Sequence, residues 1–235
     1  MKFTIIHPSR GRAHLAHKAY QKWMSSHSSV HTYEYILSID ADDPQKYLYF
    51  GLFGHNQVLI NPTPSSTVIA INNAAKISSG KVIIVISDDF ETLPDWDLKI
   101  AEATAGKTDW ILKTQDGTQG WIITLPIMDR EYYNRFGYVY NPIYKHMFCD
   151  TEMTCVADLI GKKIVSDLMF KHNHYSVGGI QKDETSVRAD NTWGEGERKF
   201  MDRWQKNFGV ENPVGKVTDE GHLKWVERRL NSYGK

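Results

Sequence analysis

The chain has 235 residues with 28 basic and 28 acidic side chains, so its formal net charge at neutral pH is zero. A basic surface covering the whole fold, as nucleic-acid-binding domains often have, is therefore excluded, and a polyanion would need a local patch. Hydrophobic residues make up 41% and charged residues 24% of the chain. These values are ordinary for a folded protein and argue against intrinsic disorder and fibrous repeats. The length suits one large domain or two small ones.

The cysteine count and the hydropathy pattern indicate the compartment. Cys149 and Cys155 are the two cysteines of the chain, which excludes a disulfide scaffold and a four-cysteine zinc site. The longest wholly apolar run is residues 82–86. A membrane span needs about 20 apolar residues, and the N-terminus lacks the apolar stretch of a signal peptide. We therefore expect a cytoplasmic protein with no membrane span.

The first half of the chain alternates short apolar strands with helices. Strands are predicted at residues 3–7, 35–39, 57–60 and 81–86, and helices over 15–23 and 68–77. Gly80 stands where a C′ glycine would end the second helix. The last of these strands is apolar at consecutive positions, as central parallel strands are. The alternation predicts βαβ units and an α/β fold with a mostly parallel sheet covered by helices on both faces.

The pattern loosens after Gly106. Strands are predicted at 110–112, 121–124 and 164–170, with a turn at 115–120. Asp129 and Asp150 are each placed to cap a helix, and further helical stretches run from about residue 190 to the C-terminus. No stretch rich in Pro, Gly or Ser divides the chain as a linker would. We expect a single domain over 1–180, in halves 1–106 and 107–180, with a C-terminal helical extension at 181–235 packed on the same domain.

Polar clusters follow four of the predicted strands. They occupy residues 8–12, 40–43, 87–89 and 172–174. In open α/β sheets, ligands bind in the crevice beyond the carboxyl ends of the strands. The topology therefore predicts that these clusters converge in space although they lie far apart in the sequence.

The adjacent carboxylates Asp88 and Asp89 directly follow the apolar strand at 82–86. Two carboxylates at such a position repel each other unless a cation compensates them. Hard cations such as Mg²⁺ and Mn²⁺ take carboxylate ligands and share them with substrate phosphates, so the pair fits a metal and diphosphate site. The alternative is a turn and helix cap formed by the same two side chains.

Two further clusters carry groups that suit such a site. One of His172 and His174 could supply a nitrogen ligand, which favours Mn²⁺ over Mg²⁺, or both could belong to a hydrogen-bonded loop. Arg10 and Arg12 lie at a strand-to-helix turn, where guanidinium groups and a helix N-terminus favour phosphate. The alternative is a pair of solvated arginines.

Asp150 and Glu152 offer a carboxylate near a helix start that could act as a general base. A helix N-terminus lowers a carboxyl pKa, so Asp150 would be ionised at neutral pH. Simple N-capping by Asp150 is the competing interpretation. Trp121, Tyr138 and Tyr140 could stack on a sugar or a base, although burial in the core is the commoner fate of such side chains.

The order of these pieces resembles that of the family-2-like glycosyltransferases of the GT-A fold. The resemblance is carried by residues 3–10, Asp40, residues 72–75 and 80–83, and the acidic pair that follows, and it covers about residues 1–175. It implies a metal-dependent enzyme that moves a sugar from a nucleotide sugar, most simply a UDP-sugar, to an acceptor hydroxyl with inversion. Here Ser87-Asp88-Asp89 stands in place of Asp-x-Asp, and Cys149-Asp150 in place of the family's Glu-Asp base motif.

The resemblance also implies roles for individual residues. The donor would be held by Pro8, Ser9, Arg10, Arg12, Asp40, Asn73 and Asp88. Asp89, with His172 or His174, would bind Mn²⁺ or Mg²⁺. Asp150 would deprotonate the acceptor, and Glu152 is the second candidate for that role.

Three other functions compete with this one. A nucleotidyltransferase needs a similar carboxylate pair, but its glycine-rich basic first loop is missing. A non-catalytic nucleotide-sugar or glycan-binding module would need no base, and a zinc hydrolase built on His172 and His174 lacks a third ligand by spacing.

The acceptor is left open among a glycan, a protein, a small metabolite and a modified nucleic-acid base. A nucleic-acid partner would need a local basic face, and a solvated helix surface is the other interpretation of the same residues. The candidates for that face are Arg188, Arg198, Lys199, Arg203 and Lys206.

Overall fold

The computed structural model describes residues 1–179 and 181–233, and within these ranges seven strands form one sheet in the order β3-β2-β1-β4-β6-β5-β7. The strands are β1 Lys2–Pro8, β2 Thr32–Asp40, β3 Val58–Asn61, β4 Val82–Val85, β5 Ile111–Gln115, β6 Ile127–Asp129 and β7 Lys163–Met169. Pairing is parallel except at β6, which runs antiparallel to both β4 and β5. The predicted mostly parallel α/β sheet is confirmed.

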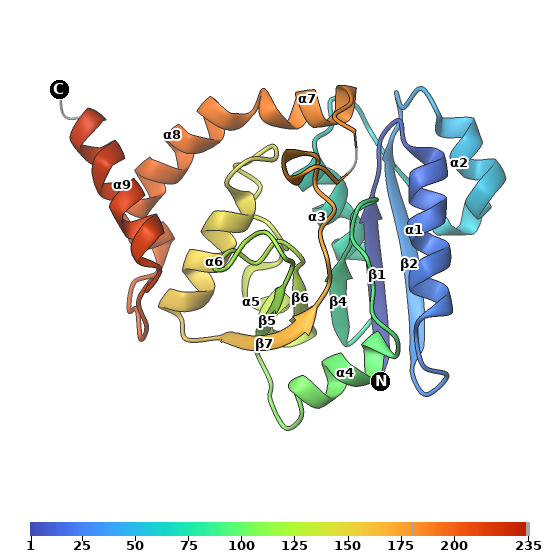
Figure 1. Cartoon of the computed structure of the whole chain (residues 1–235), viewed down its shortest axis with the longest axis horizontal. Helices are drawn as coiled ribbons and strands as arrows, with labels where there is room; N and C mark the ends of the chain where they lie inside the picture. Colours follow the sequence, from blue (N-terminus) through green and yellow to red (C-terminus); the bar gives the residue numbers. More distant parts are fainter. Residues whose placement is uncertain (180, 234–235) are drawn as a thin grey trace.

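Helices cover both faces of this sheet (Figure 1). The α-helices are α1 Ala13–Ser25, α2 Lys46–Phe53, α3 Thr67–Ile77, α4 Trp96–Ala103, α5 Arg130–Phe136, α6 Cys149–Leu159, α7 Glu184–Asp190, α8 Trp193–Trp204 and α9 Glu220–Tyr233. Short 3₁₀ turns lie at His55–Gln57, Tyr175–Val177 and Asn207–Gly209. Successive strand residues point to opposite faces. Ile5 therefore packs with α1, α2 and α4, whereas Ile6 packs with α3, α5 and α6.

The predicted cap at Asp129 is confirmed, and the predicted role of Gly80 is wrong. Asp129 accepts a hydrogen bond from the Tyr132 N–H at 2.8 Å and starts α5. Helix α3 ends at Ile77, so Gly80 lies beyond its C-cap region. A Cβ atom at Gly80 would lie 2.5 Å from the backbone nitrogen of Thr4. Glycine is required there because the chain passes close to β1, and the sequence pattern does not reveal such a contact.

The strand predicted at 121–124 is absent from the described structure, and β6 forms instead a few residues later. The 121–124 segment packs against α6, where the hydroxyl of Thr154 accepts a hydrogen bond from the Ile123 N–H at 2.9 Å. The indole N–H of Trp121 donates to Asp158 at 3.1 Å. These contacts with a helix take the place of ladder hydrogen bonds, so an apolar run alone did not decide the secondary structure.

The C-terminal helices are part of the same body. Phe200 of α8 and Val226 of α9 belong to the core that also contains residues of α6. In Figure 1, α7 lies across the edge where β1 and β4 end, and α8 and α9 continue along one side of the molecule. The predicted boundary at residue 180 and residues 234–235 lie outside the described residues, and the predicted halves remain a prediction. In the described ranges, no helix combines the length and the apolar character that crossing a membrane requires.

Candidate active site

The four polar clusters predicted from the sequence meet at the carboxyl edge of the sheet. Arg10, after β1, donates to Asp40 at the end of β2 over 2.9 Å. Ser9 donates to Asp88, after β4, over 3.1 Å. Asp89 lies 3.3 Å from the Nε2 atom of His172, which follows β7. The edge is thus built from segments that lie far apart within the first 175 residues.

Asp88 is held by three side chains of the protein. The Nε2 atom of His7 lies 3.0 Å from its Oδ1 atom, the Ser9 hydroxyl donates to the same oxygen, and the Arg12 guanidinium lies 3.7 Å from Oδ2. The other ring nitrogen of His7 contacts the Tyr35 hydroxyl at 2.6 Å. A carboxylate only accepts hydrogen bonds, so Nε2 of His7 donates to Asp88. His7 and Tyr35 therefore fix the position of Asp88, a role that we did not predict from the sequence.

Asp89 is a buried carboxylate that faces His172. Its side chain accepts from the Ser87 hydroxyl at 2.5 Å, and His172 approaches its second oxygen. Burial alone would raise the pKa of Asp89, but the contact with His172 and the Ser87 hydrogen bond outweigh burial and lower this pKa to about 2. The His172 ring stacks on Phe90 at a centroid distance of 4.2 Å, which fixes its orientation. Asp89 is therefore an anion held beside an imidazole nitrogen.

His174 lies next to this pair. Its ring centroid is 5.1 Å from that of His172, and its Nδ1 atom lies 2.7 Å from the Ser176 hydroxyl. Burial, followed by the nearby His172, lowers the pKa of His174. Of the two histidines, His172 is the one in contact with Asp89.

These donors fit a metal that is shared with a substrate. Among residues 1–179 and 181–233, no group of three or more His, Cys, Asp or Glu side chains could hold a metal ion. Asp89 and His172 together offer one oxygen and one nitrogen donor, which suits Mn²⁺ or Mg²⁺ when phosphate oxygens and water complete the shell. A zinc hydrolase needs three protein ligands, and the described part of the chain offers no such set.

The loop after β1 is closed by acidic side chains. The Arg10 guanidinium bridges Asp40 and Asp42, at 2.9 and 2.6 Å, and the Gly11 N–H donates to Asp43 at 3.0 Å. Asp40 is 8% exposed, so its carboxylate lies at the floor of this edge. The loop is therefore prearranged before any ligand arrives.

Two more residues that were predicted to bind the nucleotide-sugar donor lie beside this loop. Pro8 ends β1 opposite Ser38 of β2. The Asn73 amide donates to Asn61 at 3.0 Å, and Asn61 stands opposite Asp40 in the sheet register. Asn73 thus connects α3 to the end of β3.

Arg12 connects the loop to the C-terminal extension. Its Nε and Nη2 atoms each donate to Asp183 at 2.6 Å, and Nη2 also donates to the Ser186 hydroxyl at 2.9 Å. The Arg12 hydrogen bond keeps the pKa of Asp183 far below its usual range. The Thr185 hydroxyl adds a hydrogen bond to the Arg10 carbonyl at 2.8 Å. We call the segment Asp183 to Asp190 the strap, because it contacts Arg10 and Arg12 in the loop after β1.

Asp150 lies in the first turn of α6, and the prediction that it caps this helix is wrong. The N-cap is Phe148, in a left-handed conformation with φ of 72°. Burial raises the pKa of Asp150, and the Thr151 N–H, which donates to it at 2.7 Å, only partly offsets this effect. From its place near a helix N-terminus we predicted a lowered pKa for Asp150. Burial outweighs the effect of the helix N-terminus and raises the pKa instead. A raised pKa makes Asp150 a stronger base.

Glu152 is engaged inside the protein. It is 2% exposed and accepts hydrogen bonds from the Asn141 amide, the Tyr144 hydroxyl and the Arg203 guanidinium at 2.8, 2.7 and 2.7 Å. Its carboxylate therefore holds the start of α6 against α8.

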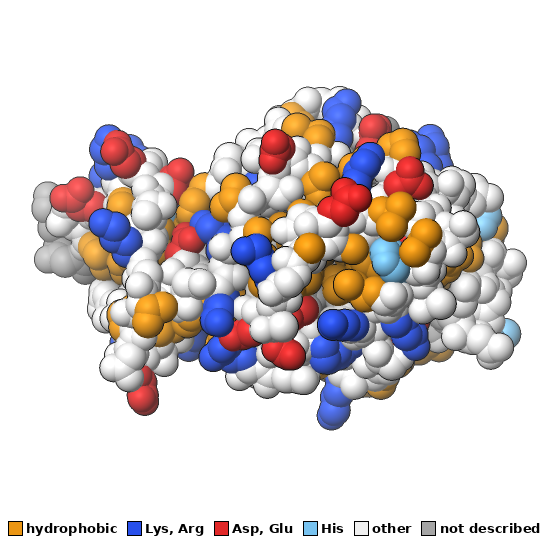
Figure 2. All heavy atoms as spheres, turned by 90° about the horizontal axis from the view of Figure 1, so that it is seen from below, with side chains coloured by type: hydrophobic (Ala, Val, Ile, Leu, Met, Phe, Trp, Pro, Cys, Tyr) orange, Lys and Arg blue, Asp and Glu red, His pale blue; other side chains and the backbone are white. Residues whose placement is uncertain are grey.

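Two of the five basic residues that were candidates for a local face on the terminal helices are paired with acidic side chains. Arg203 is paired with Glu152, and Lys199 with Glu195 at 2.6 Å. Figure 2 shows basic and acidic side chains interspersed on the face that it presents. The mixed charges favour a solvated surface over a nucleic-acid footprint on that face, which is viewed from the side opposite to α7 and α8.

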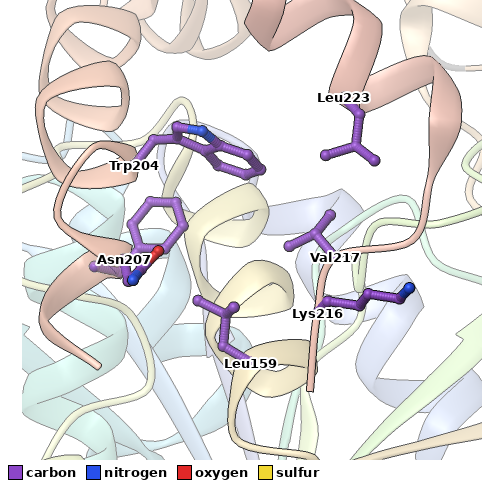
Figure 3. Close-up of a pocket in the computed structure, with 7 residues that line it drawn as sticks. Leu159, Trp204, Asn207, Lys216, Val217 and Leu223 are labelled. Carbon is purple, nitrogen blue, oxygen red and sulfur yellow. The ribbon is translucent and has the colours of Figure 1, made fainter. Parts of the chain in front are cut away.

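A separate cavity of about 210 Å³ lies among the C-terminal helices (Figure 3). Leu159, Trp204, Phe208 and Val217 give it a mainly apolar lining, with Lys216 at its side. None of the candidate catalytic or donor-binding residues lines it. Tyr140 is buried in the core, and Trp121 packs against His222 at a centroid distance of 4.4 Å, so these aromatic side chains serve packing.

Comparison with known structures defines the fold. A mannosyltransferase from Pyrobaculum calidifontis, in complex with GDP-Man and Mn²⁺, is similar with a TM-score of 0.55 and 13% identity over 72% of this chain and 56% of that chain. Glucosyl-3-phosphoglycerate synthase from Mycobacterium tuberculosis, in complex with Mn²⁺, UDP and glucosyl-3-phosphoglycerate, gives 0.56 and 10% over 81% and 78%. TarS residues 1–349 from S. aureus give 0.54 and 14% over 96% and 78%.

These similarities show that the chain has the GT-A fold of glycosyltransferases. The fold predicted from the sequence is confirmed, while the assignment to family 2 stays a prediction. No protein-family model matches the chain, and no curated protein matches its sequence. The chain spans just over half the length of the mannosyltransferase.

Proposed function

We propose that this protein is a metal-dependent glycosyltransferase that moves a sugar from a UDP-sugar to an acceptor hydroxyl with inversion. The observation that carries the proposal is the contact between Asp89 and His172 at the carboxyl edge of the sheet, beside the Ser9, Asp88 and Arg12 cluster. Three similar structures contain a nucleotide or nucleotide sugar together with Mn²⁺ or Mg²⁺, which supports this kind of donor. The two cysteines are free and buried, which suits the cytoplasm as the compartment.

The donor would lie along the loop after β1. We assign donor binding to the set predicted from the sequence: Pro8, Ser9, Arg10, Arg12, Asp40, Asn73 and Asp88. We assign the diphosphate to Arg12, because guanidinium donors pair with phosphate oxygens and its contacts with Asp88 and Asp183 fix the position of its side chain. Through its contacts with Ser9 and Arg12, Asp88 would hold these two side chains in position to bind the donor.

Asp89 and His172 would hold the metal, with His174 as the next nitrogen donor. When bound, a divalent cation offsets the negative charge that develops on the departing diphosphate. Asp150 would accept the proton of the acceptor hydroxyl, and its raised pKa strengthens it as a base. We assign this step to Asp150 over Glu152, because three donors inside the protein already take up the Glu152 carboxylate.

The test is incubation with a panel of UDP- and GDP-sugars, with and without Mn²⁺, and with four acceptor classes: a glycan, a peptide, a small polyol and a modified nucleoside. Metal-dependent release of nucleoside diphosphate, with a glycosylated product, is expected. Release of pyrophosphate would instead indicate a nucleotidyltransferase, and binding without turnover of any pair would indicate a binding module. Either result would contradict the proposal.

A further inference from the structure

His146 is a histidine near the proposed active site to which the mechanism above gives no role. Its carbonyl accepts the Cys149 N–H at 3.3 Å, and the next residue, Met147, donates its N–H to the Thr192 hydroxyl at 3.1 Å. His146 therefore lies where the start of α6 meets Thr192, two residues after the strap. Its Nδ1 atom is buried and has no hydrogen-bond partner among the described residues. Buried polar atoms are nearly always paired, so an unpaired one calls for an explanation.

The surroundings of His146 connect it to the metal and diphosphate end of the site. Burial lowers the pKa of His146 to about 4, and the charges of Asp190, His174 and Arg12 also act on the ring. Asp190 accepts the Tyr175 hydroxyl at 2.6 Å, and the Tyr175 ring lies 4.2 Å from that of His174. The imidazole is thus neutral at pH 7 and close to the residues that flank Asp89. A neutral imidazole nitrogen either accepts from or donates to a hydroxyl group.

We propose that His146 binds the transferred sugar of the donor, through a hydrogen bond between Nδ1 and a sugar hydroxyl. The inference rests on the proposed function. In the proposed function, Arg12 binds the diphosphate. Asp150, four residues after His146, accepts the proton of the acceptor hydroxyl. The transferred sugar has to lie between these two groups, and His146 lies at the start of α6, close to Asp150, with an Nδ1 atom that has no partner among the described residues. The bound sugar would then supply the partner that the free protein lacks.

The experiment compares ligand affinity and thermal unfolding for three variants. His146→Leu removes the polar atom, and His146→Asn keeps an amide group near the Nδ1 position. His222→Leu is the matched control, because His222 is also a half-buried histidine with a lowered pKa, but it packs among Trp121 and other aromatic rings away from the site. Calorimetric titrations with Mn²⁺ present first use UDP and GDP alone, and then UDP-glucose, UDP-galactose, UDP-N-acetylglucosamine and GDP-mannose. The variants are titrated with the sugar nucleotide that binds the wild type most tightly and with the matching nucleoside diphosphate.

We expect H146L to bind that sugar nucleotide about five- to tenfold more weakly than the wild type, the effect of one lost hydrogen bond, with unchanged affinity for the matching nucleoside diphosphate. H146N should recover part of the loss, and H222L should bind both ligands normally. Because the Nδ1 atom is unpaired in the free protein, the Tm of unliganded H146L should be no lower than that of the wild type. Equal loss for diphosphate and sugar nucleotide, no loss for either, or a lower Tm would overturn the inference. A wild type that binds the diphosphate and no sugar nucleotide would contradict the proposed function itself.

Discussion

Replacing Asp89 by Asn tests the proposed metal ligand with little change of shape. The substitution keeps one acceptor oxygen and removes the negative charge from a side chain that is 8% exposed. The hydrogen bond from Ser87 at 2.5 Å can survive, while the contact with His172 at 3.3 Å loses its charge. We therefore expect a loss of folding stability of about 1–2 kcal/mol, the contribution of one charge-assisted hydrogen bond.

The expected effect on activity is much larger. Removing one group that stabilises charge at a reacting centre lowers the rate by about 10²–10³, so D89N should lose nearly all sugar transfer. The assay is release of nucleoside diphosphate over a Mn²⁺ titration, and part of the lost rate should return at high Mn²⁺. Folding of the variant is checked by thermal unfolding in the same buffer.

Asp97 provides the matched control. It is also a buried carboxylate that accepts from a serine and a histidine, with Ser28 at 2.6 Å and His31 at 3.0 Å, but it lies on α4. D97N should therefore lose stability as D89N does and keep its activity. The reasoning is refuted if D89N retains wild-type turnover, or if the two variants lose activity equally.

Three further changes test other parts of the structure. D150N should lower kcat by about 10²–10⁴ with unchanged donor affinity, whereas E152Q should mainly lower the Tm; steady-state kinetics and thermal unfolding that show the reverse would reassign the base. Gly80→Ala should lower the free energy of unfolding by about 1–3 kcal/mol in urea titrations, because its Cβ meets the backbone of β1, and a neutral result would contradict that contact. The ion pair of Asp183 with Arg12 lowers the carboxyl pKa on folding, so its stabilisation is present above the ordinary carboxyl pKa of about 4 and is lost as the pH falls through the lowered value. The protection factors of the strap amides, which correct for the intrinsic exchange rate at each pH, should accordingly fall on acidification in the wild type and be low already at pH 7 in D183N; equal protection of the two proteins at pH 7 would contradict this.

The sequence predicted the parts of the site that depend on local pattern. Asp88 and Asp89 were found because they follow an apolar strand directly, and His172 because it follows another. In an open α/β sheet the carboxyl ends of parallel strands lie along one edge, so the position after a strand indicates where a side chain comes to lie. This rule is sufficient to bring segments together that are far apart in the chain.

The parts that the sequence did not predict depend on tertiary contacts. His7 lies within an apolar strand and looked like a core residue, although it orients Asp88. Asp183 is 171 residues away from Arg12, and nothing in its local pattern distinguishes it from an ordinary helix cap. The pKa of Asp150 was predicted with the wrong sign, because burial outweighed the helix N-terminus. The helix contacts of 121–124 likewise overrode its strand-like composition.

In the proposed mechanism, Asp89 would hold a divalent cation that also binds the diphosphate of a sugar nucleotide. The most direct measurement is a crystal structure of the protein grown with Mn²⁺ and UDP, with the anomalous signal of manganese used to place the ion. We expect manganese held by Asp89, His172 and phosphate oxygens, with the diphosphate beside Arg12. Manganese bound elsewhere, with the Asp89 carboxylate still paired to His172 alone, would contradict this expectation.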